Sequence, residues 1–125
     1  MISKKEMKRR IRDLVNIEVE GLTWNEKIDF IYKELIEIQI KKNNWEQTNK
    51  GKPWEDEEIK FILQHAPTKE NILKLAKIFK RGYGSIEQIY RWAAEDAKSI
   101  KEKRDDDKFI NQILKVRKQI GWRAT

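Results

Sequence analysis

Only two prolines, Pro53 and Pro67, occur among the 125 residues, so long stretches of the chain run without a proline. Proline breaks a helix because it lacks the N–H donor and its ring clashes with the preceding turn. The stretches between the prolines are rich in Lys, Glu, Ile, Leu and Gln, which favour helices. The sequence therefore predicts an all-α chain.

Composition shows that this chain can fold, although 39% of its residues are charged. Five Trp, four Phe and three Tyr join many Ile and Leu residues and supply enough apolar surface for a core. A length of 125 residues allows one compact domain, or a small trihelical core with helical extensions. Two independent large domains would not fit.

The residue inventory excludes several kinds of site. The chain has no cysteine, so disulfides and thiolate metal sites are excluded, and its single histidine, His65, excludes a multi-histidine zinc site. His65 also lacks a nearby serine or cysteine partner. No apolar run approaches the roughly 18 residues of a membrane span, and no signal-peptide core follows the basic amino terminus. We expect a cytoplasmic protein with no enzymatic activity, catalytic residue, metal or cofactor, and no membrane partner.

Two amino-terminal helices are predicted from capping-box patterns, in which side chains satisfy amides left free at a helix start. Ser3 with Glu6 predicts a helix from about Lys4 to Val15. Thr23 with Glu26 predicts a longer helix from about Trp24 to Asn43. One stripe of apolar residues on this second helix recurs at spacings of four and three: Trp24, Ile28, Ile31, Leu35 and Ile38. Further apolar residues widen the stripe, so the helix is expected to contact neighbours on two sides: Phe30, Tyr32, Ile36 and Ile40.

Three shorter helices are predicted after a polar connector over 43–52. Pro53 suits the entry to the first, which carries acidic residues at Glu55 to Glu58, where the helix dipole favours them, and runs to about Gln64. Thr68 caps the second, whose buried face is Ile72, Leu75, Ala76 and Phe79. After a turn over 80–84, Ser85 with Gln88 opens the third, which continues toward Lys103 and turns Ile86, Ile89, Tyr90 and Ala93 inward.

A last helix is predicted to begin at Asp105 to Asp107 and to end at Gly121. Its apolar face is Phe109, Ile113, Val116 and Ile120. This face either mediates self-association or packs back onto the long second helix. The predicted domains are an amino-terminal helical region over 1–48, a trihelical helix-turn-helix core over 49–93, and a helical extension over 94–125.

Positive charge dominates the chain and is unevenly distributed. The net charge is +7 and the pI is about 9.5, which implies attraction to polyanions. Six basic residues oppose two acidic ones from Thr68 to Ala93, whereas Trp54 to Pro67 holds four acidic residues and one basic. The basic cluster within Met1 to Arg12 is a second candidate contact surface.

The middle of the chain resembles Myb/SANT-like DNA-binding domains over about residues 51–93. The opening of such domains is matched by Gly51, Lys52, Pro53, Trp54, Glu57, Glu58, Ile62 and Leu63; the second helix by Leu75 and Ala76; and the basic turn and third helix by Arg81, Gly84, Ser85, Ile86, Gln88 and Tyr90. Ile72 or Leu73 replaces the tryptophan usual in the second helix. Two registers of the third helix are open. Either Ile86 and Tyr90 take the paired inward positions, which we prefer, or Gln88, Ile89, Arg91 and Trp92 imitate the helix ending.

The resemblance implies binding of double-stranded DNA, with the third helix in the major groove. By position, Gln88 and Arg91 would contact bases, and the backbone would be held by Lys80, Arg81, Tyr83 and Ser85. Arg can form a two-pronged pair with guanine and Gln with adenine. Glu87 would repel phosphate unless it accepts from a cytosine amine or points away.

The leading functional hypothesis is a DNA-binding protein, a transcriptional regulator or an accessory factor in DNA transactions. Its compartment is then the nucleoid, or the host cytoplasm if the chain is phage-encoded. The alternatives are a helical protein-interaction module and an oligomeric subunit of a DNA-processing complex, assembled as a homo-oligomer or with a protein partner through the terminal helices. For each candidate residue a structural role, such as a helix cap or a core position, competes with DNA contact.

Overall fold

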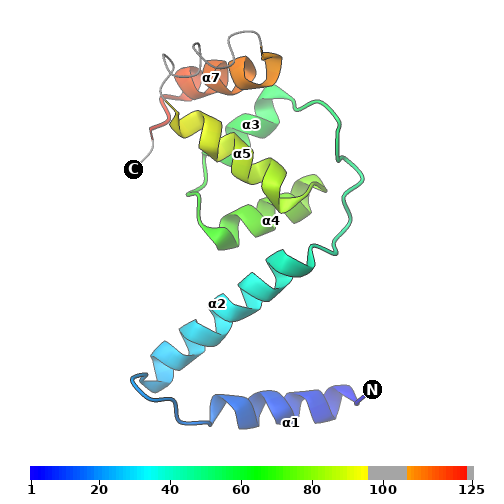
Figure 1. Ribbon diagram of the computed structural model, residues 1–125, viewed down its shortest axis with the longest axis vertical. Coiled ribbons are helices and arrows are strands. Elements are labelled where there is room, and N and C mark those ends of the chain that lie inside the picture. Colours follow the sequence, from blue (N-terminus) through cyan, green and yellow to red (C-terminus); the bar gives the residue numbers. More distant parts are fainter. Residues whose placement is uncertain (96–106, 124–125) are drawn as a thin grey trace. The chain divides into compact units, whose positions relative to one another are not determined.

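A computed structural model describes residues 1–95 and 107–123, and over these ranges the chain is helical with no strand. The predicted all-α fold is confirmed. The chain forms two compact units, Met1–Lys41 and Lys42–Thr125. The helices in chain order (Figure 1) are α1 (Lys4–Val15), α2 (Trp24–Lys42), α3 (Asp56–Leu63), α4 (Lys69–Phe79), α5 (Tyr83–Ala94) and α7 (Lys108–Ile120).

Most helix starts follow the side-chain signals in the sequence. The Ser3 hydroxyl accepts from the amide of Glu6 at 3.1 Å, and the Thr68 hydroxyl accepts from the amide of Asn71 at 3.1 Å. Each contact satisfies a backbone donor that the first turn of a helix leaves free. The same is seen at Thr23 and Asp107, and Gly121 closes α7 with a left-handed φ of 65°.

The start of α5 differs from its prediction. Its cap is Gly82, and Ser85 lies inside the first turn, where its amide donates to the Gly82 carbonyl at 3.2 Å. The predicted capping box of Ser85 with Gln88 is therefore wrong. The helix ends at Ala94, because Glu95 has an extended backbone with ψ 150°. The continuation predicted toward Lys103 lies mostly in residues 96–106, outside the described residues, as do Asp105 and Asp106.

Four of the described helices, α3, α4, α5 and α7, build the core of the second unit and lie together in Figure 1. The last helix, α7, packs on α3 and α5. It therefore belongs to the same core as the predicted trihelical unit. The buried residues of this core are Ile59, Ile62, Leu63, Ile72, Leu75, Ala76, Ile86, Ile89, Tyr90, Ala93, Ile113 and Val116.

Helix α7 also completes the carboxyl end of α5. Arg117 donates from Nη1 to the carbonyl oxygens of Ala93 at 2.7 Å and Glu95 at 2.8 Å. The last carbonyls of a helix have no partner within it, so a cation placed there both donates to them and opposes the negative end of the helix dipole. Arg117 thus ties the two helices at one end.

The amino-terminal unit buries very little. Helix α1 has no buried residue, and the only buried residue of α2 is Lys27, at 7% exposure. The Lys27 ammonium donates to the carbonyl of Ile17 at 2.8 Å, which ties the start of α2 to the segment that follows α1. The apolar side chains of both helices are largely exposed.

Candidate nucleic-acid interface

A tight turn joins α4 to α5. Helix α4 ends at Phe79, and Lys80 takes a left-handed conformation with φ 54° and ψ 49°. The amide of Arg81 then donates to the carbonyl of Ala76 at 3.0 Å, which satisfies one of the free carbonyls at the helix end. Only residues 80–82 separate the two helices, so the turn predicted over 80–84 is shorter than expected.

The connector that precedes α3 is fastened to this turn. Trp45 donates from its indole nitrogen to the carbonyl of Arg81 at 2.8 Å. The backbone amide of Asn49 donates to the backbone carbonyl of Lys80 at 3.0 Å, and its side-chain amide donates to the carbonyl of Phe79 at 2.9 Å. These bonds join segments about 30 residues apart, so the turn is held by tertiary contacts as well as by its own geometry.

Arg81 is a structural residue of the connector. Its side chain donates from Nη1 to the Lys52 carbonyl at 2.7 Å and from Nη2 to the Pro53 carbonyl at 3.2 Å. Its guanidinium carbon lies 3.7 Å from the centroid of the Trp54 ring, and Arg81 is only 5% exposed. Desolvation by burial lowers the pKa of Arg81, while the charge of Glu58 opposes this shift. The prediction that Arg81 holds a phosphate is corrected, because its charged group faces carbonyls and an aromatic ring.

The two residues predicted to contact bases lie on the solvent side of α5. Gln88 and Arg91 are both exposed, and so is Glu87, the residue before Gln88. Arg91 donates to Glu87 at 3.3 Å, with 60% and 47% of the two side chains exposed. An exposed ion pair of this kind contributes little to stability, so exchanging it for another partner costs little.

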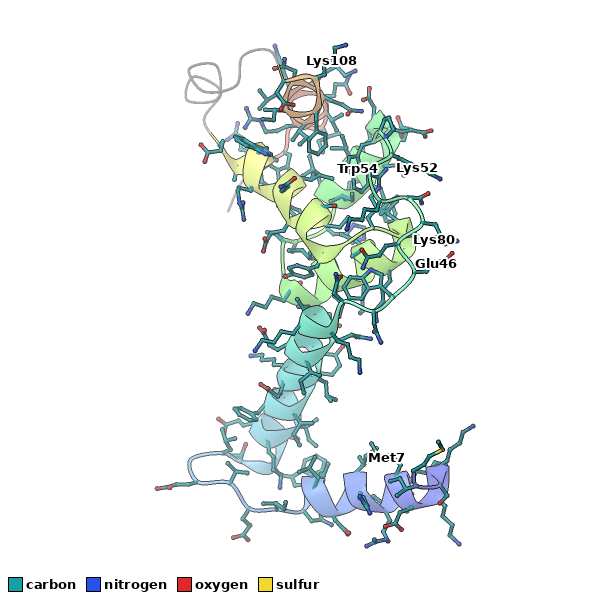
Figure 2. The ribbon with its side chains drawn as sticks, turned by 45° about the vertical axis from the view of Figure 1, so that its right-hand side comes forward. Met7, Glu46, Lys52, Trp54, Lys80 and Lys108 are labelled. Atoms are coloured by element: carbon teal, nitrogen blue, oxygen red, sulfur yellow. The ribbon has the colours of Figure 1, made fainter. Side chains whose placement is uncertain are left out.

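The remaining predicted backbone-contacting residues have different surroundings. Lys80 is exposed and lies 3.7 Å from Glu46, in the region where Figure 2 labels both. Tyr83 is half-buried and borders a groove of about 710 Å³ that also meets Lys69, Arg91 and Arg123. Ser85 is also half-buried, and borders a second cavity of about 430 Å³.

Additional cations are brought to these grooves by the fold. Lys52 from the connector and Lys108 from the first turn of α7 border the same cavity as Ser85. Figure 2 labels Lys52 beside Trp54 and Lys108 on α7. Sequence reasoning did not select Lys108 or Arg123 for the interface, because no local pattern links the last helix to the start of α5.

Tyr90 is a core residue, as its alternative structural role indicated. Its hydroxyl donates to the carbonyls of Ile62 and His65, at the carboxyl end of α3, and only 6% of the residue is exposed. Burial raises its pKa to about 12. Ile86 is also fully buried, so Ile86 and Tyr90, the pair of the preferred register, both face inward as expected.

The acidic cluster at the start of α3 also has the structural role expected. The Glu58 carboxylate accepts from the amide of Glu55 at 2.8 Å, completing a capping box. Asp56 lies 2.6 Å from Lys115, and hydrogen bonds from Lys115 and then Gln112 lower its pKa. Within the described ranges, no group of three or more acidic, histidine or cysteine side chains could hold a metal ion.

Comparison with known proteins places the chain in a family. Residues 48–124 match the family model described as "Uncharacterised protein PM1205 C-terminal domain", so the chain belongs to that family. The match spans α3 to α7.

A relative from Pasteurella multocida strain Pm70, described as "Uncharacterized protein PM1205", is 44% identical over 124 residues, which cover 98% of this chain and 99% of that protein. No solved structure matches the chain. Among the helices that the structure describes, none is long and apolar enough to span a membrane.

Proposed function

We propose that the unit formed by α3, α4, α5 and α7 binds double-stranded DNA, with α5 as the helix that enters the major groove. The observation that carries this proposal is the solvent face of α5. Gly84, Gln88 and Arg91 recur on it at spacings of four and three, which is one face of a helix. The opposite face, with Ile86, Ile89 and Ala93, is held in the core.

The chemistry of this face suits base recognition. Gln can pair with the edge of adenine, and Arg with the edge of guanine. A short turn before α5, stabilised from the connector, would hold the helix in one orientation, as a helix-turn-helix requires. On binding DNA, the Arg91 guanidinium would leave the Glu87 carboxylate and pair with guanine. The Glu87 carboxylate could then accept a hydrogen bond from the amine of a neighbouring cytosine.

Charge supports the same proposal. Over 42–95 and 107–123 the unit carries fifteen Lys and Arg residues against nine Asp and Glu. Part of the negative charge is engaged internally, as in Asp56 with Lys115. The exposed Lys80 and the cations around the two grooves would attract phosphates without reading sequence.

The proposed role is that of a transcriptional regulator or an accessory factor in DNA transactions. The corresponding location is the cytoplasm, either in association with the nucleoid or, for a phage-encoded protein, in the host cell. Fluorescence anisotropy with labelled duplexes from a random pool tests it. We expect affinity to fall steeply with salt, with a logarithmic slope of about −0.9 per phosphate contacted. Absent or salt-independent binding would contradict the proposal.

Matched variants test the role of α5. Gln88→Ala and Arg91→Ala should each cost roughly 1–3 kcal/mol on the selected site and much less on unrelated duplexes. Lys118→Ala is the control, since Lys118 is exposed on α7 and borders neither groove. Equal losses of affinity by all three variants on all DNA sequences would show that only non-specific attraction to DNA remains.

A protein-interaction module is the second candidate function. Glu87 and the acidic start of α3 favour it, since both would repel phosphate. Recovery of one specific partner after nuclease treatment, with no duplex binding, would decide for this function.

A further inference from the structure

The amino-terminal unit exposes more apolar surface than a monomeric protein usually does. Neither α1 nor α2 buries an apolar side chain. Between 48% and 59% of the surface of the following side chains is exposed: Met7, Ile11, Leu14, Trp24, Phe30, Leu35 and Ile38. Met7 projects from α1 in Figure 2. So many exposed apolar side chains on two successive helices mark an interaction site.

The pattern on α2 defines the shape of the partner. Trp24, Ile28, Ile31, Leu35 and Ile38, here called the α2 seam, alternate at spacings of four and three. This is the heptad repeat with which helices pack side by side in a left-handed coiled coil. The helix has 19 residues, so it is about 28 Å long, and the seam occupies most of that length. Its partner is therefore another helix of similar length with its own seam.

We propose that the partner is a second copy of this chain, and that two α2 helices pair through their seams to form a homodimer. A heptad seam is complementary to a copy of itself, and a two-fold axis lets the same patch serve both subunits. Among the described helices, α2 is the longest and carries such a seam over fifteen residues.

The area available agrees with a dimer. Half-exposed aromatic and aliphatic side chains of the amino-terminal unit together offer on the order of 1,000 Å² of apolar surface per chain. A standard stable interface buries about 800 Å² per partner. Pairing of two copies through the seam would cover Trp24, Leu35 and Ile38 and leave Phe30 outside the interface.

Charge at the edge of the seam also allows two copies to approach. Glu34 and Lys41 lie seven residues apart on one flank of the seam, and both are exposed. Residues seven apart share a face of the helix, so this flank carries both signs. A flank of mixed sign does not repel a copy of itself as strongly as a flank of one sign would.

Sedimentation equilibrium of the full chain without DNA tests the dimer. We expect a mass twice the 15.1 kDa of one chain, in exchange with the monomer on dilution. Leu35→Asp places a charge in the seam and should raise the dimer dissociation constant at least about a hundredfold. Leu35→Ile should keep the dimer, because an apolar side chain of equal size still packs in the seam.

Phe30→Asp is the matched control. Phe30 is as exposed as Leu35, at 59% against 58%, but five residues away on a helix put it about 140° round the axis. Phe30→Asp should therefore remain dimeric. Thermal unfolding of the core around Ile59 and Ile86 should be alike in both variants, which separates loss of pairing from loss of folding.

Three results would overturn the proposal. One is a wild-type protein that stays monomeric up to hundreds of micromolar. Another is a dimer that Leu35→Asp leaves intact. The third is equal weakening by Leu35→Asp and Phe30→Asp, which would show general apolar association rather than pairing through the seam.

Discussion

The guanidinium of Arg81 stacks 3.7 Å above the centroid of the Trp54 ring, while its two terminal nitrogens donate to the carbonyls of Lys52 and Pro53. One side chain thus joins the α4–α5 turn to the connector before α3. Its Nε atom is buried with no hydrogen-bond partner, so the terminal nitrogens and the ring contact carry the interaction. The positive charge is held for folding and not displayed to a polyanion.

Arg81→Ala should therefore destabilise the fold by about 3 kcal/mol, since it removes a desolvated cation–π contact and two charged hydrogen bonds. Urea unfolding followed by tryptophan fluorescence measures this loss. Arg81→Lys should recover little, because an ammonium lacks the planar fork that reaches both carbonyls. Unchanged stability together with weaker, less salt-dependent DNA binding would instead return Arg81 to the interface.

Lys80→Gly should separate folding from binding. Lys80 has φ 54°, a conformation that glycine adopts without strain, and its backbone hydrogen bonds do not need the side chain. The variant should be more stable by about 0.5–1 kcal/mol. If the lysine contacts a phosphate, the same variant should bind all duplexes more weakly, and the salt slope should shrink by about 1. Unfolding and anisotropy on one preparation test both parts, and unaltered affinity would remove Lys80 from the interface.

Tyr90→Phe should cost about 1–2 kcal/mol, because two carbonyls at the end of α3 lose their donor. The variant should also be less sensitive to alkali. Burial raises the pKa of Tyr90 from 10.0 to about 12, so the unfolded chain releases this proton first as pH rises. The stabilisation is complete below pH 10.0 and is lost toward pH 12. Unfolding midpoints measured from pH 8 upward should decline more steeply for wild type than for Tyr90→Phe.

Asp56 should contribute stability that disappears in acid. Hydrogen bonds from Lys115 and then Gln112 lower its pKa below the ordinary 3.8, so its stabilising effect is present above that pH. The effect is lost as pH falls through the lowered folded-state pKa. Lys115→Met should flatten the acid limb of the stability curve, whereas Lys118→Met, an exposed neighbour on α7, should not. Identical acid limbs for all three proteins would show that this ion pair is not coupled to folding.

The sequence predicts the helices well where the signal is local. Ser3, Thr23 and Thr68 each cap a helix as expected, because the cap and the amide that it satisfies lie three residues apart. Residues that repeat on one helical face, such as Ile86 and Ala93, are buried for the same reason. The capping box at Ser85 failed because Lys80 adopts the left-handed conformation, so the chain re-enters a helix sooner than a longer turn would allow.

The candidate site was predicted less well, because its contacts are not local. The position of Arg81 in a basic turn predicts a phosphate contact, but the carbonyls that accept from Arg81 lie about 30 residues earlier in the chain. Lys108 comes to the cavity beside Ser85 only because α7 packs on α3 and α5. Neither relationship leaves a periodic pattern in the sequence. Exposure of Gln88 and Arg91 was predictable from the helical face opposite the buried residues.

Arg117 on α7 supplies the donors that the last turn of α5 lacks, and Ile113 and Val116 close the core beneath it. A polypeptide that ends at Ala94 would therefore leave carbonyls without hydrogen-bond donors and apolar side chains exposed to solvent on α5, the helix proposed to bind DNA. The smallest part of this unit that we expect to fold alone therefore includes α3, α4, α5 and α7, and a chimera that contains only α3 to α5 should fail to fold.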